Sequence, residues 1–170
     1  MPLIINGSCS EDQWQRTRPG DNVEVSAERP RLYQLDDMTE LSTLDASETF
    51  GIDIESTVDV QALTPWPANL NLIAIRFLSP TDGRGFSLAR QLREAGFPGQ
   101  VRAVGELIPD QYAQLLACGF DAVEIPSHVS ERLPYYLWRR ELERFPARYQ
   151  PALGGSTPIF MRRTQRRSAA

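Results

Sequence analysis

From residue 70 onward, short apolar runs alternate with amphipathic stretches, and this alternation constrains the fold more than any other feature. Three apolar runs are expected strands: 72–77, 101–104 and 122–125. Three stretches with apolar residues at helical spacing are expected helices: about 85–95, from Pro109 to a stop at Gly119, and 130–145. Such alternation predicts an α/β fold of consecutive βα units with a mainly parallel sheet, either doubly wound or a partial βα-barrel.

Residues 1–35 differ from this core because they are irregular and β-leaning. Apolar runs between Gly- and Pro-rich turns are short strand candidates: 3–5, which an Asn-Gly turn closes, 23–25 and 32–33. We expect Trp14 to anchor this small β layer. Three further elements are expected before the core: a helix over 38–44, a strand over 51–54 and a helix over 58–63 that Ser56 or Thr57 caps.

One α/β domain is expected to hold all of these elements, because a chain of this length can bury a core without a disulfide or a metal. We place the domain at residues 1–150, with the regular βα core over 70–145. The remaining segment, 151–170, is expected to be a disordered, solvated tail with four arginines: Arg162, Arg163, Arg166 and Arg167. The net charge of the whole chain is −4, so the rest is acidic and argues against nucleic-acid binding.

The basic and metal-binding residues exclude several classes of protein. All 18 basic residues are arginine, which excludes a Walker-type phosphate loop and a Schiff-base mechanism. Cys9 and Cys118 form no CxxC pair, and two cysteines cannot hold an iron–sulfur cluster or a zinc site of their own. We recognise no cofactor or metal site. We expect reduced thiols in a cytoplasmic protein, without a signal peptide or a run of the roughly 20 apolar residues that spans a membrane.

The loops after the expected strands are candidate sites, since parallel α/β sheets bind ligands at the carboxyl ends of their strands. The loop from Ser79 to Ser87 contains Gly-Arg-Gly just before a helix, which places backbone N–H groups and an arginine at one point. An oxyanion could bind there to six candidate residues: Asp82, Gly83, Arg84, Gly85, Ser87 and Arg102. The alternative, which we favour, is structural: an aspartate that caps the helix and glycines that allow the turn.

The second loop supplies secondary candidates, Glu106, Asp110 and Gln111. A carboxylate there would need a raised pKa to act as a general acid or base, and the simpler role of Asp110 is to stabilise the helix dipole. Arg102 lies within a strand, and if it points inward it needs a partner, which Glu106, Asp82 or a bound anion could supply. Cys118 ends a helix and is expected to be a buried structural cysteine.

Several segments together resemble a bacterial family of unknown function. They are Asp-Gly-Arg-Gly-Phe-Ser at 82–87, Ala89-Arg90, Leu92-Arg93, Arg-Ala-Val-Gly at 102–105, Asp110-Gln111 and Cys-Gly-Phe-Asp-Ala at 118–122. The resemblance is dense over about residues 70–125. The chain departs from the family pattern at three positions: Glu106 in place of aspartate, and Pro109 and Ala117 in place of arginine.

Members of this family are commonly labelled oxidoreductases involved in sulfite reduction, and tend to be encoded beside the sirohaem enzyme. The resemblance implies an association with assimilatory sulfite reductase. Because the chain has no recognisable catalytic or cofactor motif, we expect an accessory protein that acts with sulfite reductase or its electron donor and carries a surface patch of apolar residues and arginine. Two alternatives stay open. One is an oxyanion-binding small enzyme or sensor at Asp82–Gly85. The other is a flavin- or nicotinamide-dependent oxidoreductase, although Gly83 and Gly85 form only part of a dinucleotide fingerprint.

Overall fold

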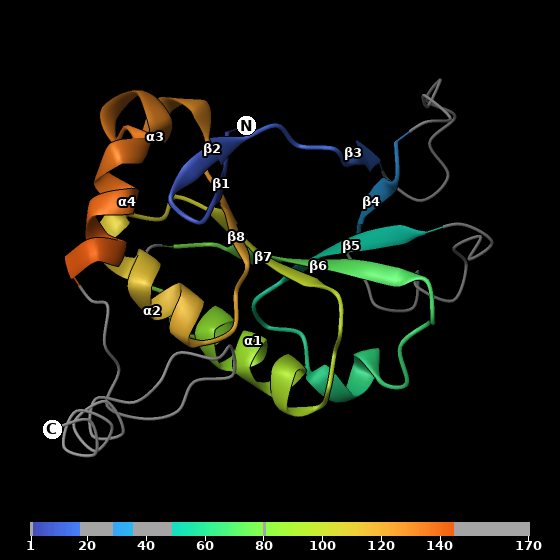
Figure 1. Ribbon diagram of the computed structural model, residues 1–170. Coiled ribbons are helices and arrows are strands. Elements are labelled where there is room, and N and C mark those ends of the chain that lie inside the picture. The colour runs from blue at the N-terminus through green and yellow to red at the C-terminus, as the bar shows by residue number, and fades with distance from the viewer. Residues whose placement is uncertain (1, 18–28, 36–48, 80, 145–170) are drawn as a thin grey trace, which may run out of the picture.

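Eight strands form one curled, mostly parallel sheet in the computed structural model of the chain, which describes residues 2–17, 29–35, 49–79 and 81–144 (Figure 1). The strands are β1 Leu3–Ile5, β2 Ser8–Ser10, β3 Gln15–Thr17, β4 Arg31–Gln34, β5 Phe50–Glu55, β6 Leu70–Phe77, β7 Gln100–Gly105 and β8 Ala122–Glu124. They lie in the order β2-β1-β8-β7-β6-β5-β4-β3. Strands β3 to β8 run parallel, and β1 runs antiparallel to both of its neighbours.

The strand order rises from β3 to β8 without a reversal. A doubly wound sheet has a switch point at which the order reverses, and these six strands have none. When all crossover connections have the same handedness, they place their helices on one face of such a sheet. Figure 1 shows α1 and α2 lying together on one side of the curved strands. The predicted α/β class and mainly parallel sheet are confirmed, with an order that suits a curled, barrel-like sheet.

The predicted alternation of strands and helices is present from β6 onward. After β6 comes α1 (Arg84–Glu94), after β7 come the 3₁₀ helix η3 (Pro109–Gln111) and α2 (Tyr112–Ala117), and after β8 come α3 (Ser127–Arg132) and α4 (Tyr135–Arg144). The helix expected over 58–63 is only a short 3₁₀ helix, η2 (Val60–Leu63). Its cap is Asp59, whose side chain accepts a hydrogen bond from the Gln61 N–H, so the prediction of Ser56 or Thr57 was wrong.

The long final helix expected over 130–145 is two helices instead. The chain leaves helical geometry at Leu133, with φ −124° and ψ 76°, directly before Pro134. A proline clashes with helical geometry at the residue before it and has no N–H to donate, so the helix ends there. The indole of Trp138 donates a hydrogen bond to the Leu133 carbonyl at 3.2 Å, which fixes the start of α4 against this break.

The N-terminal strands extend the main sheet rather than form a layer of their own. Asn6 and Gly7 have φ values of 50° and 74° and make the tight turn between β1 and β2. Strand β1 then pairs with β8, more than 100 residues away in sequence. Three expected elements lie outside the described residues: the strand over 23–25, the helix over 38–44 and the tail over 151–170.

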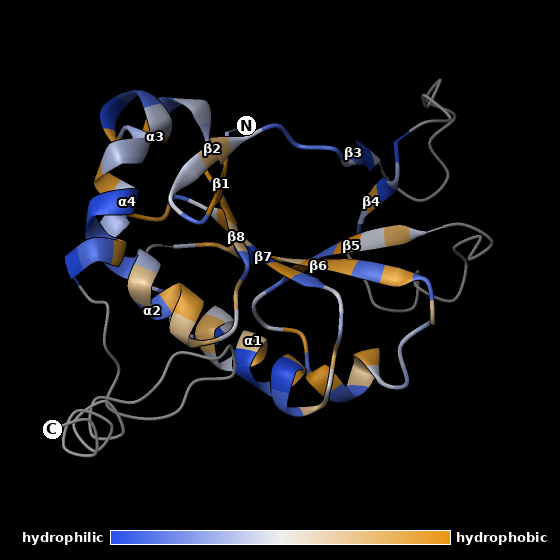
Figure 2. Ribbon diagram, in the orientation of Figure 1, coloured by the Kyte–Doolittle hydropathy of each residue, from blue (hydrophilic) through white to orange (hydrophobic). Residues whose placement is uncertain are grey.

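The two faces of the sheet are lined by different residues. Because side chains alternate along a strand, Ile73, Ile75 and Phe77 of β6 join the large apolar core with α1, α2 and α4. Leu72 and Ala74 point to the opposite face, where they form a second apolar cluster with Leu32, Val104 and Trp14. Figure 2 shows apolar residues along the central strands and a hydrophilic β3. The buried charged side chains of the strands, Asp53, Arg102 and Glu124, lie on this second face.

Candidate functional site

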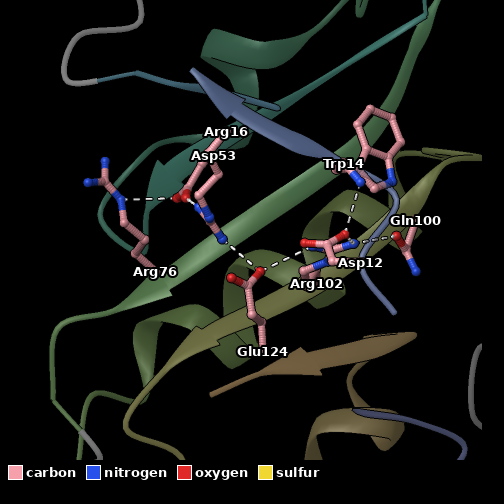
Figure 3. Close-up of polar contacts among 8 residues, drawn as sticks. All are labelled: Asp12, Trp14, Arg16, Asp53, Arg76, Gln100, Arg102 and Glu124. Carbon is pink, nitrogen blue, oxygen red and sulfur yellow. Dashed lines mark hydrogen bonds and ion pairs between the residues drawn. The ribbon is translucent and has the colours of Figure 1, made fainter. Parts of the chain in front are cut away.

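Six charged residues form a continuous chain of ion pairs on the second face of the sheet (Figure 3). Carboxylates and guanidiniums alternate along it in the order Asp12, Arg102, Glu124, Arg16, Asp53 and Arg76. We call this set the ion-pair network. Its three negative and three positive charges cancel.

The strands bring the inner members of the network together. Register pairs Asp53 with Ala74 and Ala74 with Arg102, so Asp53 of β5 and Arg102 of β7 lie in one row on either side of β6. Glu124 is the last residue of β8. These three charged side chains are no more than 3% exposed, so each needs a partner within the protein.

A short segment ties the two edges of the sheet together across this face. Residues 11–14, which we call the strap, connect edge strand β2 to edge strand β3 (Figure 1). The Asp12 carboxylate accepts hydrogen bonds from both terminal nitrogens of Arg102, at 2.8 and 3.1 Å. Asp12 Oδ1 also accepts from the Trp14 N–H at 3.1 Å, and the Trp14 ring packs on the second apolar cluster. The strap is thus held by one bidentate ion pair and one aromatic ring.

Arg16 of β3 joins the two halves of the network. Its Nη2 donates to Glu124 Oε2 at 2.7 Å, and its Nη1 donates to Asp53. Arg102 Nη1 reaches the same Glu124 oxygen at 3.1 Å. At the far end, Arg76 Nε lies 3.1 Å from Asp53 Oδ1, and its Nη2 donates to the Leu35 carbonyl at 3.0 Å.

The predicted Gly-Arg-Gly loop forms a different arrangement, an internal clamp. The Arg84 guanidinium donates two hydrogen bonds to the Asp82 carboxylate, at 2.9 and 3.1 Å, and the Arg84 N–H donates a third at 3.1 Å. Ser56, after β5, donates to Oδ2 of that carboxylate at 2.7 Å, the oxygen that also accepts from Arg84 Nη2. The hydrogen bonds from Arg84 and then from Ser56 hold the pKa of Asp82 well below its ordinary value. Arg84 therefore has its fork filled by a carboxylate of this chain.

The glycines of this loop have separate roles. A Cβ on Gly85 would lie 2.5 Å from the Phe77 ring, so the missing side chain lets α1 pack against β6. Gly83 has open space around it and an ordinary helical φ of −76°. Ser87 is exposed on α1. The structure therefore brings Asp82 and Arg84 together, with Ser56 as an unforeseen partner.

Arg102, a predicted ligand at that loop, pairs elsewhere. Its partners are Asp12, Glu124 and, at 3.5 Å, Gln100. The expected partners Glu106 and Asp82 were therefore wrong.

The secondary candidates remain near the surface. Glu106 Oε1 lies 3.2 Å from His128 Nε2, and both side chains are exposed. The Gln111 amide oxygen accepts a hydrogen bond from the Ile108 N–H at 3.1 Å. Asp110 is exposed in the first turn of η3, where a carboxylate stabilises the helix dipole.

Cys118 is partly exposed rather than fully buried. Within the described ranges, no three His, Cys, Asp or Glu side chains lie close enough to hold a metal ion.

Sequence reasoning missed five members of the network: Asp12, Arg16, Asp53, Arg76 and Glu124. A usable signal existed for three of them, because Asp53, Arg76 and Glu124 interrupt apolar runs in strands of a parallel sheet. Such strands are buried on both faces, so a charged residue there predicts a buried partner. Asp12 and Arg16 lie in a polar stretch with no comparable signal.

The central and C-terminal parts of this architecture correspond to a known family. A family model described as "Bacterial protein of unknown function (DUF934)" matches residues 51–160. The chain belongs to the DUF934 family. The family resemblance inferred from sequence is thereby confirmed, and a search of curated proteins found no match. The span matched in this DUF934 protein contains Asp53, Arg76, Arg102 and Glu124, whereas Asp12 and Arg16 precede it. Within the described ranges, no helix has the length and apolar character to cross a membrane.

Proposed function

We propose that this DUF934 protein is an accessory protein of assimilatory sulfite reduction that docks on sulfite reductase or on its electron donor. The proposal joins the family's association with sulfite reduction to one structural observation. That observation is a surface on α4 formed by Tyr135, Tyr136, Arg139 and Arg140, which we call the tyrosine–arginine face.

Both tyrosines are open to solvent, with 56% of Tyr135 and 58% of Tyr136 exposed. The opposite side of α4 packs inward. There Trp138 is fully buried and meets the Tyr112 ring edge-on at 5.6 Å, and the buried Glu141 pairs with Arg144 at 3.0 Å. Helical spacing then places Arg139 and Arg140 one turn after the two tyrosines.

This combination of side chains suits a protein partner. Tyrosine and arginine are enriched at interfaces because each supplies a large contact area together with polar groups. Arg139 pairs with Glu143 at 3.2 Å, and both are exposed, so a carboxylate on a partner can replace Glu143 at little cost. The complementary surface is therefore an acidic patch with apolar residues between its carboxylates.

The contacts of the Gly-Arg-Gly loop weigh against the first alternative, an oxyanion site at Asp82–Gly85. Arg84 is the only side-chain cation proposed within that loop, and its guanidinium already binds Asp82 in a bidentate pair. An anion would have to displace a carboxylate that Ser56 and the Arg84 N–H also hold. Docking through α4 requires no such rearrangement.

The proposal is tested by measuring binding of the purified protein to purified sulfite reductase, and separately to its electron donor, by biolayer interferometry. We expect one of the two to bind, with an affinity that falls as salt rises. Tyr135→Ala together with Tyr136→Ala should weaken binding at least tenfold. Arg90→Ala is the matched control, because Arg90 is an exposed helical arginine on α1 that pairs with Glu94. Absence of binding to both proteins, or equal loss in the control, would contradict the proposal.

A further inference from the structure

We propose that Arg102 forms a binding site for a small oxyanion, of the sulfite, sulfate or phosphate type, and that the strap residue Asp12 occupies this site in the structure described. The proposal rests on the ion-pair network and not on the docking role of α4, so either can fail without the other.

The contact between Asp12 and Arg102 has the geometry of ligand recognition. The two carboxylate oxygens meet Nη1 and Nη2 of one guanidinium at 2.8 and 3.1 Å, which is the fork by which arginine binds carboxylate, sulfate and phosphate alike. The side chain of Arg102 is 1% exposed, whereas that of Asp12 is 22% exposed. The cation therefore belongs to the rigid sheet, and the anion reaches it from the solvent side.

Arg102 also has an unused donor. Its Nε is buried and makes no hydrogen bond within the described residues, although it lies beside Nη2 on the same guanidinium. A buried N–H without a partner is costly. An oxyanion that binds the edge formed by Nε and Nη2, next to the edge that Asp12 uses, accepts a hydrogen bond from this donor.

The charges of the network favour one bound anion once Asp12 moves away. Among the described residues, Arg102 would then keep one carboxylate partner, Glu124, which it shares with Arg16. The Arg102 side chain is 1% exposed, and electrostatic attraction at such a buried site is stronger than in water. A small oxyanion restores the balance that Asp12 provided.

The strap is the part of this face that can move. Residues 11–14 have no helical or strand structure, and Glu11 and Gln13 are exposed. Segments with few buried contacts open locally at low free energy. A ligand that binds Arg102 only when the strap is displaced shifts the population toward the open form.

The test is a calorimetric titration of sulfite, sulfate and phosphate into three proteins: wild type, Asp12→Ala and Glu11→Ala. Glu11→Ala is the matched control, because it removes the same charge from the same strap at a side chain that is 86% exposed. We expect one oxyanion to bind wild type at one site. Asp12→Ala should bind it at least tenfold more tightly, and Glu11→Ala should bind it as wild type does. If Asp12→Ala does not fold, Asp12→Asn keeps the size of the side chain and removes its charge.

Two further measurements locate the site. Saturating wild type with the oxyanion should speed amide hydrogen exchange in residues 8–17, because the strap leaves Arg102. Arg84→Ala should leave the affinity unchanged. The proposal is overturned if wild type binds none of the three anions, if only Asp12→Ala binds (an anion filling an artificial hole), or if Arg84→Ala abolishes binding. It is also overturned if Asp12→Ala and Glu11→Ala bind alike.

Discussion

Arg16 shows how one partly exposed guanidinium can stabilise two buried carboxylates. Its side chain is 32% exposed, yet it donates to both Asp53 and Glu124, which are almost completely buried on β5 and β8. The attraction within such a pair roughly offsets the loss of hydration, so the network adds little net stability by its presence. Removing one member is different, because it leaves opposite charges buried and unpaired.

We expect Arg16→Met to lower the free energy of unfolding by about 3 kcal/mol, because two buried carboxylates lose a shared partner. Urea unfolding followed by circular dichroism measures this change. Arg90→Met, which removes an exposed arginine paired with Glu94, should leave the stability unchanged. Equal stability of Arg16→Met and wild type would show that the network does not depend on Arg16.

Asp82 gives a pH-dependent prediction. Its pKa is lowered in the folded protein from an ordinary value of 3.8, so its pairing with Arg84 stabilises the fold above that value and is lost as the pH falls further. Wild type should therefore be more stable than Asp82→Asn at pH 7, by an amount that is constant down to about pH 5 and shrinks toward pH 3. Unfolding curves at several pH values measure it, and a difference independent of pH would contradict the assignment.

At the scale of elements, sequence patterns predicted the features that neighbouring residues in the sequence determine, such as the bounds of a helix. The span of α1 was expected over about 85–95 and is Arg84–Glu94, because helical apolar spacing and the glycine after it both act locally. The break at Pro134 was also visible in the sequence and was missed because the apolar spacing continues across it. The pairing of β1 with β8 was not predictable, because β8 lies far away in the sequence and the local pattern of β1 does not indicate its partner strand.

The two glycines before α1 give a matched test of a structural role. Gly85→Ala should lower the free energy of unfolding by about 1–3 kcal/mol, because its Cβ would lie 2.5 Å from the Phe77 ring. Gly83→Ala meets open space at a helical φ of −76° and should be neutral or slightly stabilising. Thermal unfolding of both variants measures the difference, and equal effects would mean that packing against Phe77 does not explain Gly85.

At the scale of the whole molecule, one sheet connects the N-terminal strands to the βα units. Strands β1 and β2 extend one side of it, β3 and β4 the other, and the strap joins the two edges. The alternation of strands and helices in the sequence predicted the parallel core. It did not predict that the strap crosses the second face of the sheet. This crossing depends on ion pairs between residues 90 to 108 positions apart, such as Asp12 with Arg102 and Arg16 with Glu124, and sequence periodicity does not report such pairs.

This connection predicts that the described segments unfold as one unit, in agreement with the expected single domain over 1–150. Trp14 lies on the second face, Trp66 packs edge-on with Phe97 at 5.3 Å, and Trp138 is buried in α4. Their fluorescence and the far-ultraviolet circular dichroism should therefore report the same midpoint in urea. Separate transitions would show that the N-terminal strands and the βα units are independent.

The most direct test of the docking role is a hydrogen-exchange footprint of this DUF934 protein with purified sulfite reductase and its electron donor present in turn. One of the two should protect amides of α4, residues 135–144, and leave α1 unchanged. The Tyr135→Ala and Tyr136→Ala double variant should lose that protection while it keeps its fold. No protection with either protein, or protection confined to surfaces away from α4, would contradict the proposal that α4 docks this protein on sulfite reductase or its electron donor.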